Sequence, residues 1–216
     1  MAYGTAWPGL SRSRLVSCKG SGLTARILHD RGSNVGSMPL NVFAGGRVGV
    51  WQVERIEPVT GPSLPMVSHV AVLNGARVCD VEAVWALRGM TSYKRYTQRN
   101  EQETLDAKQP PLGRPEATRA ALIPITKSDA WWLLAQDERR ELLEETSHHI
   151  TIGLEYLPAV ARQLYHGRDL GEPFDFLTWF EYAPEDASAF EELVNRLRAT
   201  PEWGYVEREV DIRLAR

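Results

Sequence analysis

The last third of the chain switches from strand to helix and back to strand, and this order restricts the folds open to it. From Phe174 to Tyr182, aromatic residues and Thr178 alternate with the residues between them, which is typical of a β-strand. Val206 to Leu214 alternates in the same way. Between these strands, residues Pro184 to Arg198 carry an apolar stripe at helical spacing, formed by Phe190, Leu193, Val194 and Leu197. The pattern predicts an α+β domain with an antiparallel sheet and helices on one face.

Three further strands are predicted upstream. Val50 to Ile56 alternates and is followed by a loop rich in glycine and proline, while Val81 to Arg88 is apolar on both sides. Ala120 to Ile125 is apolar throughout and indicates a buried strand. Because Pro124 has no backbone N–H to donate, we expect its strand to lie at the edge of the sheet or to contain a bulge.

Helices are predicted between the strands of the second half. Ser128 or Asp129 can cap one helix and Asp137 can cap the next. Pro158 suits the first turn of a third helix, which would end at Gly167. The apolar stripe of this third helix would consist of Leu157, Val160, Ala161 and Leu164.

Composition excludes several kinds of protein. The chain has 216 residues, 43% hydrophobic and 25% charged, as in ordinary soluble globular proteins. A net charge of −3 gives no field that recruits nucleic acid or an anionic membrane, and no apolar run approaches the roughly 20 residues needed to span a bilayer. Cys18 and Cys79 are the only cysteines and form no CxxC motif, which argues against disulfide frameworks, thiolate zinc sites and iron–sulfur clusters.

Residues 1–37 differ from the rest of the chain. Serine and glycine are frequent, and Asp30 alone opposes the basic residues Arg12, Arg14, Lys19, Arg26 and Arg31. We expect an N-terminal extension that is disordered in solution, with the domain running from Met38 to the C-terminus. A transit-like or secretion-related leader is the alternative, but the segment lacks an apolar core for a signal peptide. Cytoplasm is therefore the expected location.

His149 and Arg162 are the candidates for chemistry in the second half. A neutral imidazole is a good metal ligand when its other nitrogen donates to an acceptor, although one histidine of a His148-His149 pair is more often structural or solvated. Glu202 is a candidate acceptor that spacing alone would not select. Arg162 lies near the buried edge of the predicted third helix, so it is either solvated or paired with an anion or a carbonyl group.

Taken in order, these residues resemble the haem-binding core of the chlorite dismutase family. The matching pattern begins at His149 and reads His-x12-Arg-x-Leu-Tyr-His-x3-Leu, followed by Phe-Asp-Phe-Leu-Thr-Trp-Phe-Glu. The flanking motifs Lys127-Ser128-x-x-Trp131-Trp132 and Glu202-x-x-Tyr205 fall in the expected order. The resemblance covers the chain strongly from about Val84 to the C-terminus and weakly from Met38 to Ala83.

The resemblance implies a dimeric α+β barrel built from ferredoxin-like halves. The N-terminal half is short, as in the compact branch of the family, which is described as dimeric, so we expect a homodimer. Within residues 38–216, the part from about 120 to 216 would bind haem. The chain lacks a Cys-x-x-Cys-His motif, so haem b would be held non-covalently.

Residue roles also follow from the resemblance. His149 would be the proximal iron ligand and Glu202 its hydrogen-bond partner, while Arg162 would be the distal catalytic residue. Lys127 would approach a haem propionate and Trp131 would pack beside the macrocycle. The distal pocket would be lined by Leu164, Thr178 and Phe180.

The implied activity is conversion of chlorite to chloride and molecular oxygen, with transient hypochlorite held by Arg162. A coproheme decarboxylase on the same fold is the nearest alternative. That branch usually lacks the distal arginine and relies on a tyrosine near the propionates, and Tyr93 or Tyr96 could serve there. A non-catalytic haem-binding protein is the second alternative.

Overall fold

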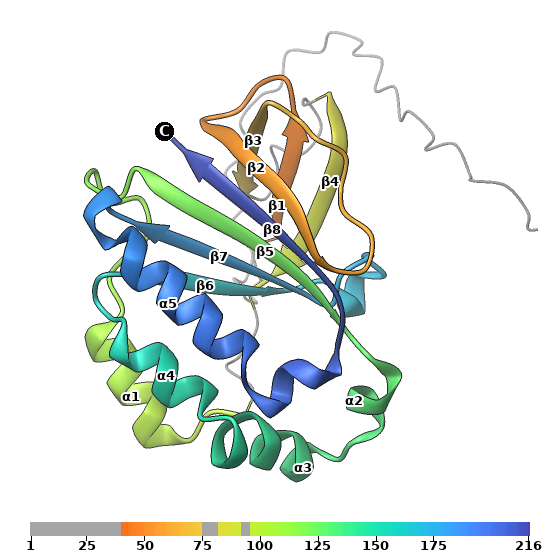
Figure 1. Ribbon diagram of the computed structural model, residues 1–216, viewed down its shortest axis with the longest axis vertical. Coiled ribbons are helices and arrows are strands. Elements are labelled where there is room, and N and C mark those ends of the chain that lie inside the picture. Colours follow the sequence, from red (N-terminus) through yellow and green to blue (C-terminus); the bar gives the residue numbers. More distant parts are fainter. Residues whose placement is uncertain (1–39, 75–81, 92–95) are drawn as a thin grey trace, which may run out of the picture. The chain divides into compact units, whose positions relative to one another are not determined.

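A computed structural model describes residues 40–74, 82–91 and 96–216 (Figure 1). The predicted extension at residues 1–37 lies outside this part of the chain, as does Tyr93. Among the described helices, none is long and apolar enough to cross a membrane.

The described strands close into a barrel in the order β1-β3-β2-β8-β5-β7-β6-β4, and each recorded pairing is antiparallel. The order repeats, because β4-β1-β3-β2 in the first half is matched by β8-β5-β7-β6 in the second. The strands are β1 Leu40–Gly46, β2 Trp51–Thr60, β3 His69–Asn74, β4 Ala83–Met90, β5 Arg119–Lys127, β6 Ala161–His166, β7 Phe176–Tyr182 and β8 Val206–Ala215.

Helices lie together on one side of strands β5 to β8 (Figure 1). They are α1 Arg99–Lys108, α2 Asp129–Leu133, α3 Gln136–Arg140, α4 His149–Glu155 and α5 Ala187–Arg198. A π-helical turn spans Glu141–Thr146, and 3₁₀ turns span Arg168–Leu170, Pro184–Asp186 and Pro201–Tyr205. The predicted combination of an antiparallel sheet with helices is confirmed.

Strand β7 separates two apolar cores, which explains why its sequence is aromatic on both faces. Leu177 and Trp179 point into the barrel, where they join Phe43, Trp51 and other buried residues. Phe180 and Tyr182 point to the other side and pack against α5. The stripe predicted on α5 is confirmed, since Phe190, Leu193, Val194 and Leu197 are all buried.

Two expectations for the strands hold only in part. Strand β5 lies between β7 and β8, so Pro124 is not at an edge. Where β5 pairs with β8, Leu122 and Ile125 have partners but Pro124 has none, because proline has no backbone N–H to donate. The bulge in β5 comes later, between Thr126 and Lys127. In β4, Val84 is 62% exposed, so this strand is not buried on both sides.

The third predicted helix is also wrong. Helix α4 ends at Glu155, and Ala161–His166 forms strand β6, which pairs along its whole length with β7. The spacing that suggested a helix also fits a period of two, because Ala161 and Tyr165 are buried on one face. Arg162 therefore lies on a strand, opposite Phe180. A segment this short fits the helical and the strand period equally well. Backbone pairing with β7 makes it a strand.

Charged residues of β8 are buried beneath α5 and paired with one another. Glu209, Asp211 and Arg213 are each at most 5% exposed. Arg198 of α5 donates to Glu209 and Asp211, and Arg213 pairs with Asp211 and with Glu191 of α5. Burial raises the pKa of Asp211, but the hydrogen bonds and charges of Arg213 and Arg198 outweigh this and lower it. These pairs offset the cost of removing the charges from water.

Replacing Phe190 with alanine should lower the free energy of unfolding by about 3–5 kcal/mol, because the ring is fully buried and leaves a cavity. Its centroid lies 4.5 Å from that of Tyr182 and 5.2 Å from that of Phe180. Urea unfolding followed by tryptophan fluorescence measures the change. Leu133→Ala is the control, since Leu133 is 87% exposed. Equal losses in the two variants would contradict this packing.

Candidate active site

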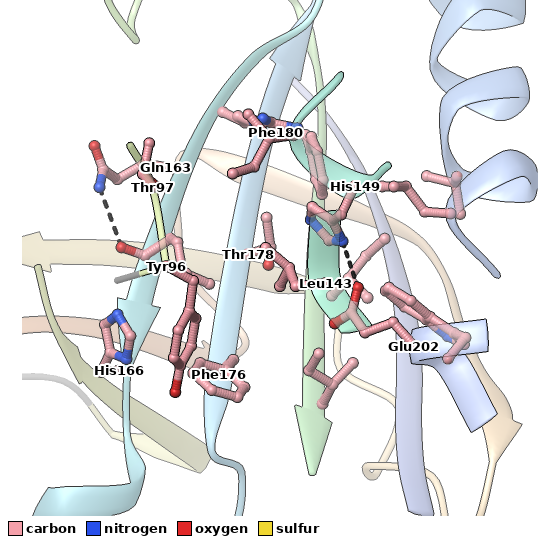
Figure 2. Close-up of a pocket in the computed structure, with 18 of the residues that line it drawn as sticks. Tyr96, Thr97, Leu143, His149, Gln163, His166, Phe176, Thr178, Phe180 and Glu202 are labelled. Carbon is pink, nitrogen blue, oxygen red and sulfur yellow. Dashed lines mark hydrogen bonds and ion pairs between the residues drawn. The ribbon is translucent and has the colours of Figure 1, made fainter. Parts of the chain in front are cut away.

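A cavity of about 360 Å³ lies against the helix-facing side of β5, β7 and β6 (Figure 2). Its sheet wall is set by register, because Thr178 stands opposite Leu164 on one side and Ile123 on the other. Phe176 and Phe180 extend this wall along β7. The cavity is therefore lined mainly by apolar side chains, with few polar groups among them.

All the site residues expected from the sequence line this one cavity: Lys127, Trp131, His149, Arg162, Leu164, Thr178, Phe180 and Glu202. They come from β5, α2, α4, β6, β7 and the turn Pro201–Tyr205. Five residues before about 120 also line it, namely Tyr96, Thr97, Leu105, Asp106 and Gln109. The cavity therefore extends upstream of the part that we expected to bind haem.

His149 is held by a buried carboxylate. Its Nδ1 lies 2.7 Å from Oε2 of Glu202. Figure 2 marks this contact with a dashed line. Because a carboxylate only accepts, Nδ1 carries the hydrogen, and Nε2 is left with a free lone pair. Among the described residues, no cluster of His, Cys, Asp and Glu could hold a metal ion by itself.

The second oxygen of Glu202 binds Lys127. Nζ of Lys127 lies 2.8 Å from Oε1 of Glu202 and donates also to the Glu202 carbonyl at 3.2 Å. Burial raises the pKa of Glu202, but its interactions with His149 and Lys127 outweigh this and lower it to about 2. The carboxylate therefore stays ionised at neutral pH.

The position of Lys127 differs from the role expected for it. We expected its amine beside a haem propionate, but the side chain is 3% exposed and its ammonium is bound to Glu202. The amine lies 4.7 Å from the ring centroid of Trp131 and 5.4 Å from that of Trp203. Its charge is satisfied inside the protein, so in this structure it supports the partner of His149.

The backbone around His149 is fixed by residues that the sequence did not single out. Glu144, in the π-helical turn, accepts hydrogen bonds from the backbone N–H groups of Ile150 and Thr151. Ser147 Oγ accepts from the backbone N–H of Glu202 at 2.9 Å and ties α4 to the turn that carries the carboxylate. The backbone of His148 is left-handed, with φ 54°. His148 is the N-cap of α4, so the helix begins at His149. No sequence pattern marks Glu144 or Ser147 for these roles.

The side chain of Arg162 lines the cavity. None of the described residues makes a hydrogen bond or ion pair with its guanidinium, whereas its carbonyl accepts from Gln109 Nε2 at 3.0 Å. Burial lowers the pKa of Arg162 to about 10, against an opposing effect from the charge of Glu144. The group keeps its charge at neutral pH, so the cavity presents free, directed donors to an anion.

Trp131 is 1% exposed and lies edge-on to the rings of Tyr96 and Tyr205. Its Nε1 is a buried donor without a partner among the described residues. Such groups are uncommon in folded proteins and often indicate a ligand or water that completes the site. Trp132 instead donates to Asp175 at 3.3 Å and stacks on Phe176, consistent with packing.

Comparison with known families identifies the group to which this arrangement belongs. The family model described as chlorite dismutase matches residues 71–216, which is more than half of the chain. The chain belongs to the chlorite dismutase family. The match includes the cavity residues and most of the barrel.

Individual relatives agree with this assignment. A dimeric chlorite dismutase from Nitrobacter winogradskyi is 59% identical with a TM-score of 0.77, over 82% of this chain and 99% of that chain. A mutant chlorite dismutase from Candidatus Nitrospira defluvii is 19% identical with a TM-score of 0.61, over 82% and 91%, and shows a shared fold. Chlorite dismutase from Ideonella dechloratans is 37% identical over 86 residues, 40% of this chain but only 28% of that protein.

Replacing Lys127 with methionine should lower the free energy of unfolding of the apoprotein by about 3–5 kcal/mol, because Glu202 then keeps a buried charge with one partner fewer. Urea unfolding at neutral pH measures the loss. Lys108→Met is the matched control, since Lys108 is exposed at the end of α1. A loss no larger than that of the control would show that the buried pair is dispensable for stability.

Proposed function

We propose that this protein converts chlorite to chloride and molecular oxygen, using haem b held non-covalently in the cavity. The observation that carries the proposal is the guanidinium of Arg162, which no described residue pairs and which faces an apolar cavity that also contains His149. A small bound anion would supply the negative charge that this guanidinium lacks. The assignment of the chain to the chlorite dismutase family supports chlorite as that anion.

The residues of the cavity fit a haem. His149 offers Nε2 as a ligand, and among the described residues no group of three or more His, Cys, Asp or Glu side chains could hold a metal ion. The apolar lining suits a macrocycle, and the unpaired Nε1 of Trp131 is a donor for a polar group of the bound molecule. When bound, haem supplies an iron with an open position at which an oxygen atom of chlorite is transferred.

Arg162 would act on the anions of the reaction. Its fixed charge would bind chlorite and then retain hypochlorite, until the remaining oxygen atom leaves in O₂ and chloride is released. It does this without accepting a proton, since a guanidinium has no acceptor atom. Leu164, Thr178 and Phe180 keep much of the surrounding surface apolar, and exclusion of water strengthens the attraction between the guanidinium and the anion.

Glu202 and Lys127 would act on the ligand. The carboxylate fixes the orientation of the His149 ring and makes Nε2 a stronger donor to iron. Lys127 keeps the Glu202 carboxylate ionised. The carboxylate is also held in one orientation, because one oxygen binds Lys127 and the other binds His149. The three side chains would thus hold the iron on one side of the cavity.

The assembly we propose is a homodimer of barrels with two ferredoxin-like halves. The repeated strand order supports the halves, since both read fourth-first-third-second. The second half also has helices between β5 and β6 and between β7 and β8, as a βαββαβ unit requires. The 59% identical relative from Nitrobacter winogradskyi is described as dimeric, which supports the homodimer.

Replacing His149 with alanine should remove most of the haem from protein purified after haem loading, because the cavity then has no iron ligand. The ratio of Soret to protein absorbance measures the haem content. His148→Asn is the matched control, since asparagine tolerates the left-handed backbone at this position. Haem lost from the control and retained by His149→Ala would reverse the ligand assignment.

Replacing Arg162 with alanine should lower kcat/KM for chlorite by about 10²- to 10³-fold, the effect of removing a preorganised donor from developing negative charge. An oxygen electrode measures the rate on protein of equal haem content. Arg99→Ala, at an exposed position of α1, should retain full activity. If haem-loaded wild type evolves no oxygen from chlorite, the proposed function is wrong.

A further inference from the structure

Helix α4 is short, and its own sequence does not favour a helix. It has seven residues and begins at His149. Three β-branched residues, Ile150, Thr151 and Ile152, follow one another, and the next residue is a glycine. β-Branched residues lose side-chain freedom in a helix, and glycine is the least favourable residue there apart from proline. Because isolated helices shorter than about 12–15 residues are marginal in water, α4 depends on contacts with the rest of the protein.

The N-cap residue of α4 does not satisfy the first turn. N-cap residues usually have extended backbone, and a serine, threonine, asparagine or aspartate side chain accepts from the second or third backbone N–H of the helix. In α4 the N-cap is His148, which has left-handed backbone and a side chain that makes no cap hydrogen bond. The second and third N–H groups belong to Ile150 and Thr151. They need an acceptor from elsewhere in the chain.

Glu144 supplies this acceptor from the π-helical turn before α4. Its Oε2 accepts from the backbone N–H of Ile150 at 2.6 Å, and its Oε1 accepts from that of Thr151 at 3.2 Å. The hydroxyl of Thr151 also donates to Oε1, and the Glu144 carbonyl accepts from the backbone N–H of His148 at 2.9 Å. Glu144 is 6% exposed and lies outside the cavity lining. Its carboxylate therefore takes the place of an N-cap side chain.

We propose that Glu144 is a positioning residue for the iron ligand, an inference that rests on the proposed function. Glu144 fixes the first turn of α4, and the first residue of that turn is His149. The fixed turn brings Nδ1 of His149 to 2.7 Å from the Glu202 carboxylate. Without Glu144 the turn loosens and this hydrogen bond weakens, so Nε2 becomes a poorer donor to iron.

The test compares Glu144→Ala with wild type, both loaded with haem. We expect the dissociation constant of haem to rise by about 10- to 100-fold, the usual cost of losing support behind a metal ligand. The iron–histidine stretch in the resonance Raman spectrum of the ferrous protein should move to lower frequency. Hydrogen-exchange mass spectrometry should show faster exchange in peptides that cover α4. Loss of stability alone would leave the frequency of the stretch unchanged.

Two conservative variants separate contact from charge. In Glu144→Gln the carbonyl oxygen can accept from Ile150, and the amide can donate to the Thr151 hydroxyl, which also accepts. This variant should restore most of the haem affinity and of the iron–histidine frequency. Glu144→Asp keeps the charge but is one methylene shorter, so it should shift the frequency as alanine does. It carries the test if Glu144→Ala does not fold.

Glu141→Ala is the matched control, because Glu141 is exposed in the same π-helical turn. It should have the haem affinity and the iron–histidine frequency of wild type. An unchanged frequency and haem affinity in both Glu144→Ala and Glu144→Asp would overturn the proposal. So would a Glu144→Gln variant as impaired as Glu144→Ala.

A double-mutant cycle tests whether Glu144 acts through the hydrogen bond of His149. In a Glu202→Gln background, adding Glu144→Ala should shift the iron–histidine frequency much less than it does in wild type. An equal shift in both backgrounds would refute action through this hydrogen bond. A wild type that shows the expected shift but evolves no oxygen from chlorite would refute the proposed function and leave this inference standing. Haem that is not bound through His149 would refute this inference.

Discussion

The buried contact between the Lys127 ammonium and the Glu202 carboxylate determines much of the arrangement around it. Burying a carboxylate is costly unless opposite charge and hydrogen bonds compensate. Lys127 supplies the charge from β5, which leaves the second oxygen free to hold His149 at 2.7 Å. Ser147 secures the backbone of Glu202 from the other side. Sheet, helix α4 and the turn Pro201–Tyr205 are therefore joined at one ionised group.

Much of the site could be predicted from the sequence, because the order of its residues resembles the haem-binding core of the chlorite dismutase family. His149, Arg162 and Thr178 were expected in one pocket, and the structure lines one cavity with them. The aromatic strand was also predictable, since its two alternating faces each serve a different core. Spacing along the chain predicts a strand or a helix well where the element is long and its period is clear.

Contacts that depend on tertiary geometry could not be predicted in this way. Arg162 was expected on a helix because a segment of six residues fits both periods, and only pairing with β7 decides between them. Lys127 was expected to face the cofactor, but its direction depends on where Glu202 lies in space.

The chain of charges beneath α5 has a consequence for how such a sequence can change over time. Arg198, Glu209 and Asp211 share hydrogen bonds, and Arg213 connects them to Glu191. Replacing one of these residues leaves an opposite charge buried without a partner. This lowers stability more than replacing the whole pair with apolar residues does. Substitutions here are therefore tolerated in compensating sets rather than singly. Among relatives, these positions should vary together, as whole groups of polar or of apolar residues.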